Sequence, residues 1–81
     1  MRETADQQER RHRRVRAEHR KKLVALEQAE AAARDEYGYS CAKVVLGEGD
    51  ESAVREVEAE VDRLAAAVRR ARAADHYLSP A

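Results

Sequence analysis

An apolar seam in the C-terminal part of the chain restricts most strongly what this sequence can fold into. Its members recur at alternating steps of three and four residues, with one polar exception: Val54, Val57, Val61, Leu64, Val68, Ala71, Asp75 and Leu78. This spacing places them on one side of an α-helix and is typical of a coiled coil. Because such a side avoids water, the seam requires a partner helix.

A second apolar stripe precedes the first and predicts that partner. It also advances mainly in threes and fours, through Leu23, Leu26, Ala29, Ala33, Tyr37, Cys41, Val44 and Val45. Gly38 interrupts it at a cost of about 1 kcal/mol relative to Ala. Residues 39–46 could alternatively form a strand, but no second strand is available to pair with it. We therefore expect one helix over residues 5–46, with a bend at Gly38 allowed.

The residues between the two stripes predict a tight turn. Gly47 follows the last apolar residue, where a left-handed residue commonly ends a helix. Asp50 stands at the N-cap position, and Glu51 suits the positive end of a helix dipole. We expect a turn over residues 47–50 and a second helix over residues 51–77. So short a connection makes the helices antiparallel. With the turn centred between Glu48 and Gly49, we expect the second helix to end opposite about residue 20 and the basic residues before it to project beyond the hairpin.

The predicted fold is therefore all-α, an antiparallel two-helix coiled-coil hairpin that oligomerises. The chain has 81 residues, 40% charged and 4% aromatic, without Trp or Phe, and cannot fill a wide core. We expect the hairpin (residues 23–78) to complete its core with a second copy of itself or with a helical partner protein. The predicted hairpin or oligomer interface is Leu23, Leu26, Tyr37, Cys41, Val44, Val45, Val54, Val57, Val61, Leu64 and Val68.

The first 22 residues form a predicted basic arm. They contain nine Arg and Lys against four acidic residues, and the rest of the chain has the opposite imbalance. A basic helix can bind the phosphate backbone of DNA or RNA, or an acidic protein surface; a solvated tail is the alternative. The predicted binding residues are Arg10, Arg11, Arg13, Arg14, Arg16, Arg20, Lys21 and Lys22.

The sequence contains none of the motifs we would associate with catalysis. It has no phosphate-binding Gly loop, and its single Cys excludes an internal disulfide. Asp75 with His19 and His76 is a weak metal pattern, opposed by cationic neighbours. Cys41 is expected to pack in the core. We expect no catalytic residues, metal, cofactor, small-molecule substrate or membrane contact, and a cytoplasmic location. Residues 79–81 are expected to be a tail that ends the second helix.

Three functions remain open at this point. The first is a non-enzymatic interaction or assembly module, in which the hairpin self-associates or docks on a partner and the arm binds an anionic partner. The second is a nucleic-acid-binding accessory protein that uses the Arg-rich arm. The third is a small structural component of a larger viral or mobile-element assembly.

Overall fold

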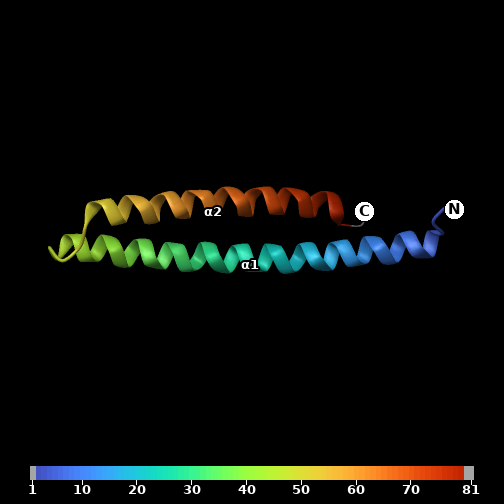
Figure 1. Ribbon diagram of the computed structural model, residues 1–81, viewed down its shortest axis with the longest axis horizontal. Coiled ribbons are helices and arrows are strands. Elements are labelled where there is room, and N and C mark those ends of the chain that lie inside the picture. Colours follow the sequence, from blue (N-terminus) through green and yellow to red (C-terminus); the bar gives the residue numbers. More distant parts are fainter. Residues whose placement is uncertain (1, 80–81) are drawn as a thin grey trace.

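Two long antiparallel helices lie side by side in the computed structural model, which describes residues 2–79 (Figure 1). Helix α1 spans Ala5–Val45 and helix α2 spans Glu51–Leu78. The molecule is a thin rod with extents of 66 × 23 × 14 Å. The predicted all-α hairpin is confirmed, and both helices end within one residue of the expected positions.

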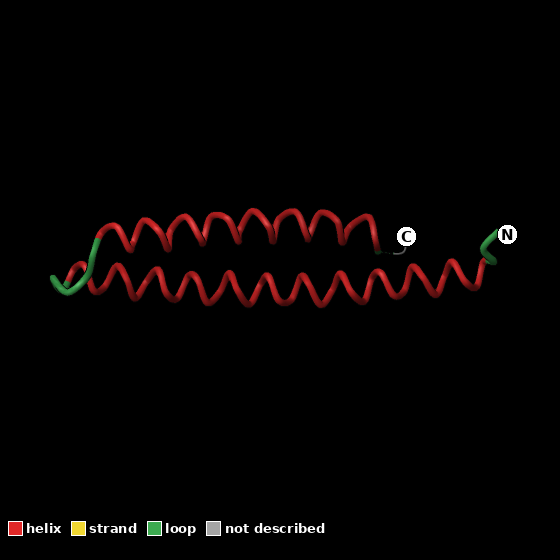
Figure 2. Tube along the Cα trace, viewed as in Figure 1, coloured by secondary structure: helices red, strands yellow, loops and turns green. Residues whose placement is uncertain are grey.

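The segment 39–46, which could alternatively have formed a strand, is helical up to Val45, the last residue of α1. The helix runs without interruption through Gly38 to Val45, with Leu46 as its C-cap (Figure 2). No strand occurs within residues 2–79. The stripe of apolar residues decided the conformation here, and the β-propensity of Tyr and Val did not.

Both helices begin at a capped N-terminus. Thr4 Oγ1 accepts a hydrogen bond from the Gln7 backbone N–H at 3.2 Å, and Gln7 Oε1 accepts one from the Thr4 N–H at 2.9 Å. This is a capping box, a feature that the sequence analysis missed. At α2, Asp50 Oδ1 accepts from the Ser52 N–H at 2.9 Å, as its N-cap position predicts.

The turn folds back tightly onto the end of α1. Gly47 has a φ of 77°, and the Gly47 and Glu48 N–H groups donate to the carbonyls of Val44 and Lys43 in a Schellman motif. A Cβ added to Gly49 would lie 2.8 Å from the Val44 nitrogen. Gly49 therefore permits a close approach that any side chain would obstruct.

This fold-back changes how the two helices are aligned. A turn centred between Glu48 and Gly49 would end α2 opposite residue 20, which was our expectation. Instead, Tyr77 and Leu78 share a hollow with His12, Val15 and Arg16. The expected alignment is wrong by a few residues, because the turn packs on the last turn of α1 and shifts α2 towards the N-terminus.

The seam of α2 faces α1 along its whole length. Val68 is 2% exposed and is the one buried side chain among residues 2–79; the other seven seam positions are half-buried. On α1, Ala29 is exposed and Glu30 is half-buried in its place, paired with Arg34 at 3.2 Å. The contact stripe of α1 therefore includes a carboxylate that the apolar pattern did not predict. Neither helix has a stretch long and apolar enough to cross a membrane, within the part that the structure describes.

Candidate interaction surfaces

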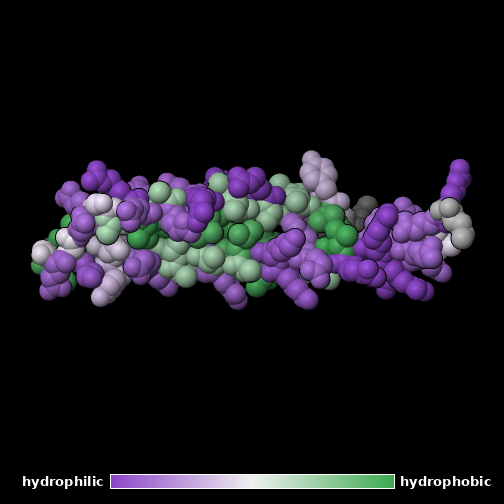
Figure 3. All heavy atoms as spheres, in the orientation of Figure 1, coloured by the Kyte–Doolittle hydropathy of each residue, from purple (hydrophilic) through white to green (hydrophobic). Residues whose placement is uncertain are grey.

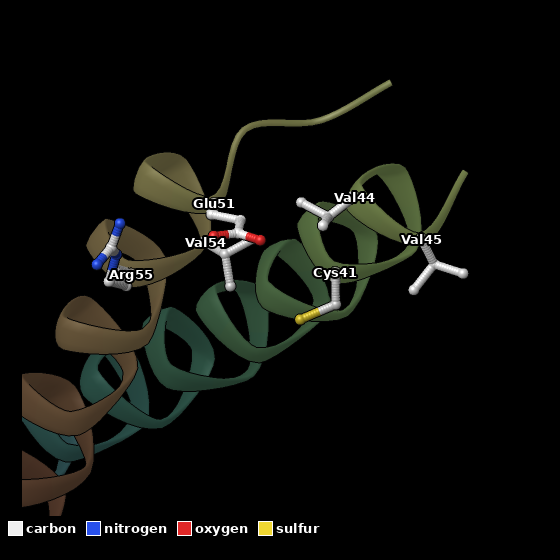
Figure 4. Close-up of a pocket in the computed structure, with 6 residues that line it drawn as sticks. All are labelled: Cys41, Val44, Val45, Glu51, Val54 and Arg55. Carbon is white, nitrogen blue, oxygen red and sulfur yellow. The ribbon is translucent and has the colours of Figure 1, made fainter. Parts of the chain in front are cut away.

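The end of the rod that contains the turn presents an apolar surface. A shallow hollow of about 400 Å³ lies between the last turns of α1 and the first turns of α2 (Figure 4). Four predicted interface residues line it with two charged ones: Cys41, Val44, Val45 and Val54, together with Glu51 and Arg55. Beside it, Tyr39, Val45 and Leu46 are 61%, 86% and 71% exposed. Val45 thus lies outside the contact between the helices.

Tyr37 and Cys41 are neighbours one helical turn apart near this hollow. A side-chain hydrogen bond with Cys41 raises the pKa of Tyr37 above its ordinary value of 10.0, and charge on Cys41, Glu58 and Asp62 acts in the same direction. Glu58 and Asp62 belong to α2, so the charges that raise this pKa come from the neighbouring helix as well as from α1. Cys41 is a free thiol and is half-buried.

The opposite end of the rod combines apolar and basic side chains. Tyr77 is 86% exposed and Val15 is 45% exposed. Val15 and Leu78 line the hollow that they share with Tyr77, and they also line an adjoining hollow with Arg14, Glu18, His19 and Lys22. His19 Nε2 donates to the Ala71 carbonyl oxygen at 2.8 Å, so the predicted arm is in contact with α2 from about His12 onwards. From Ala5 onwards the arm is the N-terminal part of α1, whose N-cap is Thr4.

The eight predicted binding residues of the arm differ in whether they form ion pairs. Arg11 pairs with Glu3 at 3.1 Å, and Arg13 and Arg16 each lie 3.6 Å from Glu9. The other five form no ion pair within residues 2–79: Arg10, Arg14, Arg20, Lys21 and Lys22. These five are available to an anionic partner.

Helix α2 adds basic residues that sequence reasoning did not assign to this surface. Arg72 pairs across the hairpin with Glu27 at 3.1 Å, and the hydrogen bond between His19 and the Ala71 carbonyl places the same turn of α2 beside the arm. Arg69 and Arg70 are exposed on the preceding turn and form no ion pair in the described chain. Two adjacent arginines in the sequence could have indicated a basic site on α2. Only the alignment of the helices shows which part of α1 lies beside them.

Folding divides the charge of the protein between the two ends of the rod. We call residues 35–62 the tip half, and residues 2–34 with 63–79 the open half. The tip half contains nine acidic and two basic side chains, and the open half contains seven acidic and fourteen basic ones. The net charges are −7 and +7 in a chain of zero net charge. Figure 3 shows hydrophilic side chains over the end where α1 extends beyond α2, and apolar atoms along the boundary of the helices.

Asp75 has no ionic role in the described structure. It forms no ion pair with Arg20 or Lys22, and its backbone carbonyl accepts hydrogen bonds from Ser79 at 2.9 Å. No group of three metal-ligating side chains occurs within residues 2–79. His76 instead packs edge-on against Tyr77, with ring centroids 5.4 Å apart. Of the expected tail, Ser79 is the C-cap of α2, and residues 80–81 lie outside the described range.

No protein-family model, curated protein or solved structure matches this chain.

Proposed function

We propose that this protein is a non-enzymatic assembly module, a helical hairpin that associates with a second copy of itself or with helices of another protein. The supporting observation is incomplete burial. One side chain, Val68, is fully buried in the described hairpin, whereas Tyr39, Val45, Leu46 and Tyr77 are each more than half exposed. Apolar surface gains about 25 cal/mol per Å² when it leaves water, so these side chains favour association.

The shape of the molecule supports binding to another protein rather than to a small molecule. A rod 14 Å thick consists of two helices in contact, and its hollows open to solvent along their sides. Small-molecule sites are usually enclosed between layers that bury most of the ligand. A single free Cys is compatible with the cytoplasm, where we place the protein in this proposal.

Sedimentation equilibrium at micromolar concentration tests the assembly. We expect dimers or larger species that remain helical by circular dichroism. Replacing Tyr39, Val45 and Leu46 by Gln should weaken the association and preserve the helix content. Replacing Ala53 and Ala59, exposed alanines of α2, by Gln is the control and should leave the association unchanged. A folded monomer at these concentrations would overturn the assembly of the chain with itself.

A nucleic acid is the second candidate partner, because basic side chains from both helices gather in the open half. Binding to phosphates releases counterions, so affinity should fall steeply as salt increases. The decisive variant replaces four residues that form no ion pair within the described chain, Arg10, Arg14, Arg69 and Arg70, by Gln. Its salt dependence should be shallower than that of the parent on duplex DNA or RNA. Replacing Lys43 and Arg55 of the tip half by Gln is the control. Unchanged affinity in the four-residue variant would exclude this role.

A further inference from the structure

The two ends of the rod are complementary to each other in charge, and both are apolar at the surface. The tip half has a net charge of −7 and contains three of the four most exposed large apolar side chains, Tyr39, Val45 and Leu46. The open half has a net charge of +7 and contains the fourth, Tyr77. Each end therefore has the properties that a binding site for the other end requires.

The two ends of one molecule cannot neutralise each other. Tyr77 lies at the level of residues 12–16 of α1, about thirty residues from Val45 and so about 45 Å away along the helix. At physiological ionic strength, charges are screened beyond about 8 Å. Only a second molecule can bring an acidic tip to a basic open end.

We infer that the partner of this hairpin is a second copy of the same chain, bound antiparallel, so that the tip half of each copy packs against the open half of the other. This inference rests on the proposed assembly function and adds the orientation. An antiparallel pair makes two equal contacts related by a twofold axis, the commonest arrangement of homodimers. A parallel pair would place −7 against −7 and +7 against +7, and like charges at an interface are unfavourable.

The contact predicted at each end combines apolar side chains with a charged border. Val45 and Leu46 of one copy approach Val15 and Tyr77 of the other. Arg14 and Lys22 border the hollow beside Val15, and Glu51 borders the hollow beside Val45. The apolar side chains supply affinity, and the charges select the orientation.

Engineered cysteines test the orientation directly. In a Cys41→Ala background, the double variant Val45→Cys/Tyr77→Cys should form disulfide-linked dimers under mild oxidation. The two positions are too far apart within one chain to be bridged, because a disulfide requires Cα atoms within about 7 Å. Each single variant is the matched control and should remain uncrosslinked.

The outcomes separate this inference from the proposed function. Rapid crosslinking of Val45→Cys alone would show a parallel pair and overturn the inference. The inference would also be overturned if the double variant sediments as a dimer but does not crosslink. Both results would leave self-association, and so the proposed function, intact. Monomeric sedimentation of the parent chain would overturn self-association itself. A ladder of linked species would indicate an open chain of molecules and overturn the closed pair.

Charge reversal provides a second measurement that needs no cysteine. Glu48→Lys with Glu56→Lys makes the tip half less acidic and should raise the dimer dissociation constant about tenfold at low salt. Glu3→Lys with Glu18→Lys is the matched change in the open half and should lower the dimer dissociation constant. Both effects should shrink as salt is added. If both variants raised the dissociation constant equally, or both lowered it equally, the inference would be contradicted.

Discussion

The open half and the tip half of the hairpin are held together by different means. In the open half, Val68 is buried, and two polar contacts join the helices: His19 to the Ala71 carbonyl at 2.8 Å, and Arg72 to Glu27 at 3.1 Å. In the tip half, Val54, Val57 and Val61 are only half-buried, but the backbone connects the helices through the turn. The turn therefore holds the helices together in the tip half, whereas the open half depends on contacts between the two helices.

The largest expected effect tests the packing of the open half. Val68→Asp should destabilise the hairpin by about 3–5 kcal/mol, because it places an unpaired charge at the one buried position in the described chain. Urea unfolding followed by circular dichroism measures it. Val24→Asp, at a side chain 52% exposed, is the control and should change stability by less than about 0.5 kcal/mol. Equal losses in both variants would show that Val68 has no special role.

The second effect tests the backbone of the tip half. Gly49→Ala should cost about 1–3 kcal/mol, because its Cβ would lie 2.8 Å from the Val44 nitrogen and 3.0 Å from Lys43 atoms. Gly38→Ala is the matched control. A Cβ at Gly38 meets nothing within 4 Å, so Ala should stabilise the helix by about 1 kcal/mol. Differential scanning calorimetry should show shifts of opposite sign, and shifts of the same sign would contradict the tight turn.

The third effect compares the two helix N-termini. Asp50→Ala should cost about 1 kcal/mol of global stability, because this cap begins α2 inside the hairpin. Thr4→Ala removes a cap where α1 extends beyond α2. Its effect should be confined to faster hydrogen exchange in the first turns of α1, with no change in the unfolding midpoint. A midpoint shift as large as that of Asp50→Ala would show that the extension is packed against something.

The smallest effect concerns pH. The pKa of Tyr37 is raised above 10.0 in the folded chain, chiefly by Cys41, so folding favours the neutral phenol. The stability that this shift contributes is fully present at pH values below the pKa of the residue in the unfolded chain. It is lost as the pH rises through the higher pKa of the folded chain. Stability should therefore decline above pH 10 in the parent chain and decline less in Tyr37→Phe. Parallel pH profiles of the two proteins would exclude this role of Tyr37.

The sequence alone determined the two helices, their ends and the face that α2 buries. These features are local: apolar residues every three or four positions, Gly47 after the last of them, and Asp50 before the next helix. The eight seam positions from Val54 to Leu78 could be predicted because α-helical periodicity fixes which side chains share a side.

Only the tertiary structure decided how the helices are aligned, and much of the candidate interaction surface depends on that alignment. Gly49 packs on Val44 and α2 is shifted towards the N-terminus, so that Ala71 contacts His19 and the neighbouring Arg69 and Arg70 lie beside the basic arm. Periodicity cannot predict this, because sliding one helix along another preserves the buried side of each while changing every partner across the contact.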